Sequence, residues 1–440
     1  MLFIPILLTI LSIGTLLGSL YRPKWGAWCY LIYMFLAPYL YIGGFIIYAR
    51  TLAFIFLIFF ILQIRGKLKR SDYEPFTPYV VLLSCSFLFV ITAEQFDSAL
   101  NSWLASITSL FYLFYLYGIM KTDKKSVSLF KWTLFGIMLA VVIYGLVLTT
   151  IPGLNPYLMI LQPLFGQEFN EAYALGGSGL DSAANMTLAE GRMFGRISSF
   201  FTHPMVYGLN LGFFFIYVIY IFKNKPKLLV ILLTLIITAI FTSGVRTPIG
   251  ALAVTVIAMM LYMRKFKYFF FGTAGFLAVI YLLPLISPEM SEYVFSIVNP
   301  DDSNTTGSNM DMRLRQLEGC FNIVQNDFLI GKGYGWEKWY NASFGTHPQA
   351  LWFESLLFCV LVDTGIIGII LWVVYGFKYY KYAQTKIYDP TLRVTILSLL
   401  VYFVSYCMIT GDFDIRYMYV FFTIMICLNQ PQMDINGKSE

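Results

Sequence analysis

The chain has 440 residues, of which 58% are hydrophobic and only 12% are charged. A soluble domain is about half apolar and about a quarter charged, so this composition excludes an ordinary soluble protein. The formal net charge of +6 comes from lysine and arginine clusters between apolar runs. In a membrane protein such clusters report topology, so they do not indicate nucleic-acid binding.

Apolar runs long enough to cross a bilayer as helices, about 20 residues each, follow one another along the chain. We interpret the first run as a span and not as a signal peptide, because no basic segment precedes its apolar core. The predicted spans lie near residues 2–20, 25–43, 46–64, 76–96, 99–120, 129–151, 203–222, 228–244, 247–263, 268–287, 349–377, 394–410 and 417–428. The last run is short, and the second and third can form one kinked unit, so about 12 or 13 spans are expected. The predicted fold is an all-α polytopic membrane protein with two long extracytoplasmic loops.

Basic clusters occur on every second loop, near residues 22–24, 65–70, 121–125, 223–227, 264–267 and 378–393. Basic loops remain on the cytoplasmic side of a membrane, so these loops are predicted to be cytoplasmic and the two long loops external. The expected units are an N-terminal bundle, the first external loop, central helices, the second external loop, and C-terminal helices with a short cytoplasmic tail. Their predicted ranges are 1–151, 152–202, 203–287, 288–348 and 349–440.

The external side is rich in arginine. It carries only two lysines, Lys332 and Lys338, but seven arginines: Arg50, Arg192, Arg196, Arg246, Arg313, Arg315 and Arg416. Topology alone does not explain external arginines, whereas their rigid, permanently charged fork suits phosphate or carboxylate. The alternative for each is pairing with an external acid.

Both histidines of the chain stand in the tripeptide Thr-His-Pro, as His203 and His347. Histidine is the side chain whose unperturbed pKa lies nearest neutrality, so both are candidates for proton transfer or substrate contact. Arg192 and Arg196 precede His203 and would share a face of a helix. The alternative for His203 is a cap at the start of a helix, because Pro204 suits a first helical turn.

A short turn, Thr242–Pro248, joins two predicted spans and holds Arg246 at the membrane surface. An arginine fixed there loses solvation energy unless it has an anionic partner, which makes Arg246 a candidate anion ligand. The alternative is an arginine that extends to the lipid headgroups.

The second long loop contains a predicted amphipathic helix on the membrane surface, with Arg313 and Arg315 at its start. Its apolar stripe consists of Leu314, Leu317, Phe321, Val324 and Phe328. The glycine-rich segment Gly331–Gly335 lacks the spacing of a phosphate loop. Trp336, Trp339 and Tyr340 suit stacking on sugar rings, and equally suit the aromatic belt of a membrane interface.

His347 is predicted to begin the next helix, with Glu354 about two turns further along the same face. An acid near the membrane boundary is a functional candidate, and Glu354 would orient His347 or hold its proton. The alternative for Glu354 is an ion pair with an arginine. Neither of the two long external loops contains an Asp-x-Asp motif, and the chain has no His-Glu-x-x-His motif, so an enzyme of this kind is expected to work without a metal or another cofactor.

The order of these features resembles the O-antigen ligase/polymerase superfamily of bacterial envelope polysaccharide synthesis. The short arginine turn comes first, then Arg313 and Arg315 before a helix that ends in Asn326–Gly335. His347 and the run Asp363–Gly368 follow, and Gly195–Pro204 upstream also fits, so the resemblance covers roughly residues 190–370.

The resemblance implies an undecaprenyl-diphosphate-linked oligosaccharide as donor, on the outer face of the bacterial plasma membrane. It implies that Arg196, Arg246 and Arg313 or Arg315 hold the pyrophosphate, and that His347 acts at the transfer step. Arginines can stabilise the charge that develops on a pyrophosphate leaving group, and a neutral imidazole can accept the proton of the acceptor hydroxyl.

Three functions are compatible with these residues. We favour a polymerase that extends a lipid-linked repeat unit in O-antigen, capsule or exopolysaccharide synthesis; the alternatives are a ligase that transfers the glycan to lipid A core and a lipid-linked oligosaccharide flippase. Transporters carry ionisable residues near the bilayer midplane, whereas most charges here lie at or beyond the ends of spans. The lipid bilayer is an expected partner, and a chain-length regulator is a further candidate.

Overall fold

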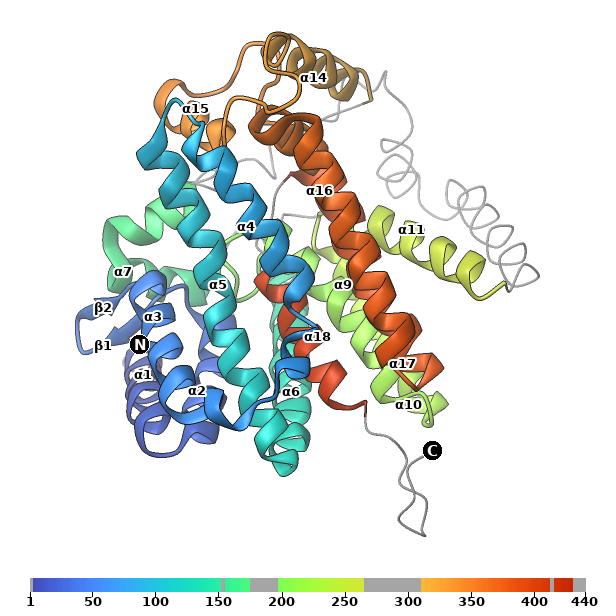
Figure 1. Ribbon diagram of the computed structural model, residues 1–440. Helices are drawn as coiled ribbons and strands as arrows, with labels where there is room; N and C mark the ends of the chain where they lie inside the picture. The colour runs from blue at the N-terminus through green and yellow to red at the C-terminus, as the bar shows by residue number, and fades with distance from the viewer. Residues whose placement is uncertain (1–2, 152–154, 175–196, 265–309, 412–414, 430–440) are drawn as a thin grey trace.

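The computed structural model describes residues 3–151, 155–174, 197–264, 310–411 and 415–429 (Figure 1). Two of the predicted features, the span at 268–287 and the arginines Arg192 and Arg196, lie outside these residues. Among the described helices, seven are long and apolar enough to cross a membrane, and five shorter apolar helices accompany them. The prediction of an all-α polytopic membrane protein is confirmed.

The N-terminal part begins with a tight helix pair, α1 (Phe3–Tyr21) and α2 (Pro23–Leu36). Gly18 and Gly26 lie at their crossing, where a side chain on either would collide with the other helix, so the two backbones approach closely. The predicted span 25–43 ends early, because a hairpin of β1 (Leu40–Ile42) and β2 (Phe45–Ile47) follows α2. Its turn residues, Gly43 and Gly44, both have positive φ, a conformation that glycine adopts without strain.

The remaining helices of the first half follow the predicted spans more closely. They are α3 (Ala49–Phe59), which continues through a π-helical turn (Phe60–Ile64), then α4 (Thr77–Ile91), α5 (Phe96–Thr122) and α6 (Lys124–Leu148). The first external loop departs from expectation. It is predicted to be a loop, but its first part forms a helix, α7 (Pro156–Ala174).

In the second half the elements are α9 (Pro204–Ile221), α10 (Pro226–Thr242), α11 (Thr247–Tyr262), α14 (Met310–Ile323), α15 (Trp336–Phe344), α16 (Leu356–Lys386), α17 (Pro390–Thr410) and α18 (Arg416–Cys427). Proline stands in the first turn of α9, α10, α11 and α17, where its missing N–H costs no hydrogen bond. The predicted amphipathic helix of the second external loop corresponds to α14.

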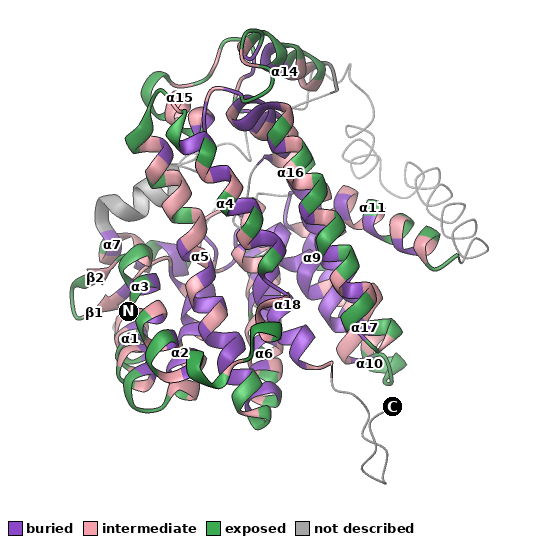
Figure 2. Ribbon diagram, in the orientation of Figure 1, coloured by how far each residue is buried: buried purple, intermediate pink, exposed green. Residues whose placement is uncertain are grey.

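The centre of the bundle is formed by α18 together with α9 and α17 (Figure 2). Every residue of α18 from Met418 to Cys427 is buried, which explains why this short helix is apolar on all faces. Buried tyrosines tie the central helices together: Tyr402 donates to the carbonyl oxygen of Gly208 (3.1 Å) and Tyr406 to that of Met205 (2.6 Å). Each hydroxyl thus finds a partner that a buried polar group requires.

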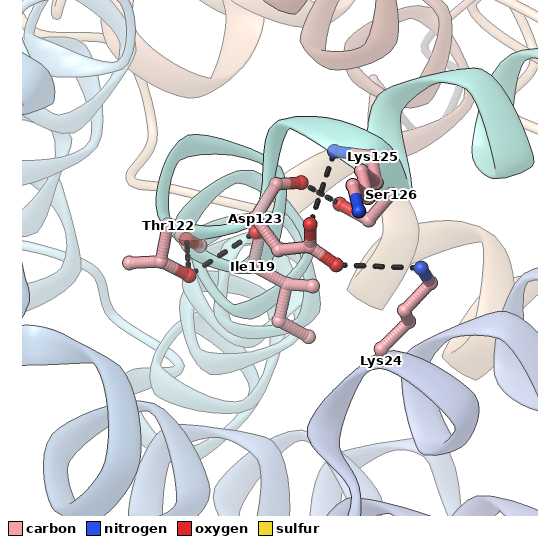
Figure 3. A network of polar contacts seen from close by, with 7 residues as sticks. Lys24, Ile119, Thr122, Asp123, Lys125 and Ser126 are labelled. Atoms are coloured by element: carbon pink, nitrogen blue, oxygen red, sulfur yellow. Dashed lines mark hydrogen bonds and ion pairs between the residues drawn. The ribbon is translucent and has the colours of Figure 1, made fainter.

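Four ion pairs among the described residues link the basic connections at one end of the bundle. They are Lys24–Asp123 (3.3 Å), Lys121–Asp72 (3.6 Å), Lys386–Glu74 (2.8 Å) and Lys223–Asp389 (2.7 Å). Asp123 also caps α6 by accepting a hydrogen bond from the Lys125 amide (Figure 3). The basic connections of these pairs therefore meet at one end, which we call the lysine-rich end. The helices α14 and α15 lie at the opposite end (Figure 1).

Candidate functional site

The end of α17 far from the lysine-rich end brings together three of the candidate residues. Tyr406 holds the start of α9 through Met205, two residues after His203. The Ile409 carbonyl oxygen accepts a hydrogen bond from Arg313, and the Ile409 side chain lies beside Gly250, one turn after Arg246. Three of the candidates, distant in the sequence, are thus assembled around one helix end.

The structure distinguishes the two arginines of α14. Arg313 is partly buried, bonds to α17 and forms an ion pair with Glu354 (3.4 Å between Nη2 and Oε2). Arg315 is exposed, because residues two apart on a helix point in nearly opposite directions. Burial lowers the pKa of Arg313, and the Glu354 carboxylate partly opposes this shift. Guanidinium remains charged throughout the physiological range, so Arg313 is a fixed cation in a partly desolvated place.

The apolar stripe predicted for α14 is divided in the structure: one part is buried and the other part is exposed. Val324, just after the helix, is buried together with Cys320, whereas Leu314, Phe321 and Phe328 are exposed. Phe321 and Phe328 stack on each other, with ring centroids 6.1 Å apart. This exposed apolar surface fits a helix that lies against the bilayer.

Arg246 lies in the short turn that the sequence predicted, between α10 and α11. The preceding Ser243 is buried, and its carbonyl oxygen accepts a hydrogen bond from the Ile197 amide (3.1 Å). The half-buried Arg246 is the N-cap residue of α11, next to the helix amides that carry partial positive charge. The turn is therefore anchored at Ser243 and presents a cationic group at a helix N-terminus.

The predicted helix start at His347 is wrong. The segment from His347 to Leu351 forms a tight loop in which the two residues exchange backbone hydrogen bonds of 3.2 and 2.9 Å. Leu351 and Phe353 have φ values of +50° and +51°, which no right-handed helix contains, and α16 begins only after its cap residue Ser355. His347 and Glu354 therefore do not share a helical face. Glu354 adopts the alternative arrangement, the ion pair with an arginine.

The ring of His347 has a defined hydrogen-bonding role in this loop. Its Nδ1 accepts from the backbone amides of Gln349 (3.2 Å) and Ala350 (3.0 Å). A neutral ring that accepts at Nδ1 carries its proton on Nε2, so Nε2–H is a donor. Partial burial lowers the pKa of His347, and protonation of Nδ1 would also break both amide contacts.

Aromatic side chains surround His347. Tyr340, Phe353 and Trp336 have ring centroids 4.9, 5.8 and 6.4 Å from the imidazole. Trp336 and Tyr340 lie four residues apart on α15 and therefore share a face. Trp339, also predicted as a sugar contact, packs against Phe344 instead (5.5 Å). A flat aromatic wall next to a donor is a suitable surface for a sugar ring.

The glycine-rich segment after α14 docks on a break in α16. Gly365 interrupts α16 with φ of +63°, and the freed amides of Ile366 and Ile367 donate to the carbonyl oxygens of Phe328 and Leu329. In return the amides of Lys332 and Gly333 donate to the carbonyl oxygens of Val362 and Asp363. Gly331–Gly335 is therefore a structural element that supports the second external loop.

Asp363, the first residue of the run Asp363–Gly368, has a structural role. Its carboxylate accepts from the amides of Gly335 (2.8 Å) and Glu337 (3.1 Å), so it caps α15 from a neighbouring helix. It thereby fixes the helix that carries Trp336 and Tyr340. The sequence offered no signal for this pairing, because the two segments are about 28 residues apart and the contact depends on the break in α16.

Two cavities on either side of α5 were not predicted. The first, about 300 Å³, lies below the second external loop and is lined by hydroxyl groups together with apolar side chains, Lys338 and Asp363; we call it the hydroxyl chamber. Its hydroxyl residues include Ser86, Ser102, Ser106, Ser109, Tyr334 and Thr364. The second, about 540 Å³, is lined by Arg50, Arg416, Tyr30, Tyr39, Tyr48 and Tyr112; we call it the arginine chamber. Ala105 and Ser109 line both chambers, which therefore adjoin across α5.

The hydroxyl chamber presents acceptors. Ser86, Ser106, Ser109 and Thr364 each donate to a carbonyl oxygen of their own helix, which leaves the lone pairs of the oxygen available. Ser106 also bonds Tyr334 of the second external loop (3.0 Å). Serines at positions 102, 106 and 109 follow helical spacing, and this was the signal in the sequence that could have revealed the chamber.

His203 matches its alternative interpretation. It is the N-cap residue of α9, and its Nδ1 accepts from the Met205 amide (3.1 Å), with Pro204 in the first turn. Among the described residues, no group of three histidine, cysteine or carboxylate side chains is arranged to hold a metal ion. At this end of the bundle Arg313 is paired with Glu354.

A comparison with protein families identifies the central part of the chain. Residues 229–373, about a third of the chain, match the family described as O-antigen ligase. The matched residues include Arg246, Arg313, Arg315, His347 and Glu354, whereas His203 precedes them. The chain matches no curated protein and no solved structure. The family match supports the resemblance seen in the sequence, because residues 229–373 are similar to the family described as O-antigen ligase.

Proposed function

We propose that this protein is a polysaccharide polymerase of the bacterial inner membrane. It would transfer a glycan from an undecaprenyl-diphosphate-linked donor to a sugar hydroxyl of a lipid-linked repeat unit, on the extracytoplasmic face and without a metal. The observation that carries the proposal is the O-antigen ligase family match, which spans the arginine turn, the arginine of α14 and the histidine loop. Its apolar helices and this family match support a multi-pass membrane protein of glycan synthesis.

The leaving group of this reaction is a lipid pyrophosphate, on which negative charge develops during transfer. Arg246 and Arg313 are assigned to it, because both belong to elements that pack around the end of α17. Both are held before substrate arrives, Arg246 by the anchored turn and Arg313 by Ile409 and Glu354. Cations held in advance stabilise developing charge without reorganisation, and a term of this kind is often worth several kcal/mol.

His347 is proposed to act at the transfer step in one of two ways. In the hydrogen-bonding state found here, Nε2–H donates a hydrogen bond, which suits the bridging oxygen between sugar and phosphate, and the proton of the acceptor hydroxyl then leaves on the pyrophosphate. As a general base, Nε2 accepts the proton of the acceptor hydroxyl, and this requires the proton to move to Nδ1 and the amides of Gln349 and Ala350 to be released. The first way uses the loop as it stands.

The hydroxyl chamber is proposed to hold the glycan. Its walls offer acceptor oxygens to sugar hydroxyls, and the aromatic wall at Trp336 and Tyr340 belongs to the same loop region as its Tyr334. A ligase is the second candidate function, because the matched family is described as O-antigen ligase. The two activities use the same donor chemistry and differ in the acceptor.

The test is elongation by purified protein in lipid nanodiscs supplied only with a lipid-linked single repeat. A polymerase yields a ladder of lipid-linked oligomers, whereas a ligase yields product only after lipid A core is added. Arg313→Ala is expected to reduce the rate at least about 100-fold, in the range seen when one preorganised charge partner is removed. Arg315→Ala, two residues away on the exposed face, is the matched control and should retain activity. Verified substrates that give no product with either acceptor would refute the proposal.

A further inference from the structure

A third cavity lies at the lysine-rich end, and its inner end shares Leu82 with the lining of the hydroxyl chamber. It is a groove of about 440 Å³ between the start of α4 and the second half of α16. The α4 wall is formed by Thr77, Pro78, Val81 and Leu82, and the α16 wall by Leu371, Val374, Tyr375, Lys378, Lys381, Tyr382, Thr385 and Lys386. Glu74 closes its basic end.

The groove is apolar along most of its length and cationic at one end. Val81 and Val374 are 47% and 41% exposed, so the apolar part opens toward the surface that the bilayer covers. Val374, Lys378 and Lys381 follow one another at spacings of four and three, so they form one stripe along α16. Along α16 the apolar side chains are therefore followed, about one helical turn later, by ammonium groups. One leaflet of a bilayer has the same arrangement, with acyl chains next to charged headgroups.

The charge at the cationic end is uncompensated. Glu74, the one acid of the groove lining, already forms an ion pair with Lys386 (2.8 Å). In the part of the chain that the structure describes, no acid lies within ion-pair distance of Lys378 or Lys381, and both side chains are exposed. Three lysines against one glutamate leave a net positive groove.

We infer that this groove binds one anionic phospholipid, with the phosphate on Lys378 and Lys381 and an acyl chain along Val374 and Val81. A free phosphate would satisfy the lysines but leave the apolar walls without a ligand. A neutral lipid would fill the walls but leave the lysines without an anion. Basic pockets between helices at the membrane boundary are suited to acidic headgroups, and each lysine near such a surface contributes about 1 kcal/mol.

The test is native mass spectrometry of the purified protein with phosphatidylglycerol or phosphatidylcholine carrying identical acyl chains. The wild-type chain should retain phosphatidylglycerol in preference, and an excess of inorganic phosphate should not displace it. The double variant Lys378→Ala/Lys381→Ala should weaken phosphatidylglycerol binding roughly 30-fold, the equivalent of about 2 kcal/mol for two lysines. Lys124→Ala/Lys125→Ala removes two exposed lysines from another basic connection and should leave binding unchanged.

A second pair of variants tests lipid binding by filling the groove without changing its charge. This pair also tests the inference if the lysine variant fails to fold. Val374→Trp fills the groove, whereas Val373→Trp adds the same bulk at a neighbouring position that is 66% exposed and outside the groove lining. Binding should fall only in the first. Equal retention of both lipids, displacement by phosphate, or equal binding by both tryptophan variants would overturn the inference.

Discussion

At the scale of single residues, the environment of His347 predicts the protonation state of its imidazole and the pH dependence of activity. Burial lowers its pKa, and the amides of Gln349 and Ala350 favour the neutral ring. The neutral form therefore predominates at neutral pH, and it is lost only as the pH falls below the ordinary histidine value of about 6.5. Activity should rise with pH to a plateau with a midpoint below 6.5. A maximum in the acidic range would show that the imidazolium is the active form.

Two substitutions separate the two proposed roles of this histidine. His347→Gln keeps a donor group but cannot accept a proton at neutral pH, whereas His347→Ala removes both functions. If donation is the role, the glutamine variant should retain a substantial fraction of elongation, without the acidic inflection, and the alanine variant should lose about 100-fold or more. Equal loss in both would favour the general base. Retention of normal chain length in the alanine variant would remove His347 from the mechanism.

At the scale of elements, the break in α16 is the feature on which the second external loop depends. Gly365 has positive φ, and an added Cβ would lie 2.5 Å from the Leu329 carbonyl carbon. Gly365→Ala should therefore destabilise the protein by about 1–3 kcal/mol and detach the loop. Gly376→Ala is the matched control on the same helix, because its Cβ would meet nothing within 4 Å. Thermal unfolding of both variants checks this; an equal melting temperature would contradict the account.

The elements also show what sequence reasoning could and could not reach. Span positions, the short Arg246 turn and the helix of Arg313 followed from apolar length, prolines and periodicity, which are local properties. The start of α16 could not be predicted in this way. The Thr-His-Pro tripeptide suggests a helix that begins at His347, whereas the positive φ values of Leu351 and Phe353 exclude one. The hairpin after α2 carried a Gly-Gly signal that the apolar run concealed.

The pairing of Asp363 with α15 and the choice between Arg313 and Arg315 required three-dimensional contacts. Asp363 caps a helix that it reaches only because α16 is broken, and Arg313 is distinguished from Arg315 by its contact with α17. The sequence pattern does not tell which of the two arginines faces the bundle, because both are the same residue type in the same turn of the helix. The sequence therefore predicts a set of candidates, and packing selects among them.

At the scale of the whole molecule, the adjoining chambers lead to the last prediction. Ala105 is exposed on α5 and lines both chambers, so Ala105→Trp would occupy space in each without entering the packed core. A polymerase that holds an extended glycan across α5 should then make shorter products while its melting temperature changes little, since the substitution removes no core contact. Ala140→Trp, at an exposed position of α6 outside both chambers, should leave product length unchanged. Product length is read from the ladder of lipid-linked oligomers, and full-length ladders from Ala105→Trp would show that the glycan does not pass through this junction.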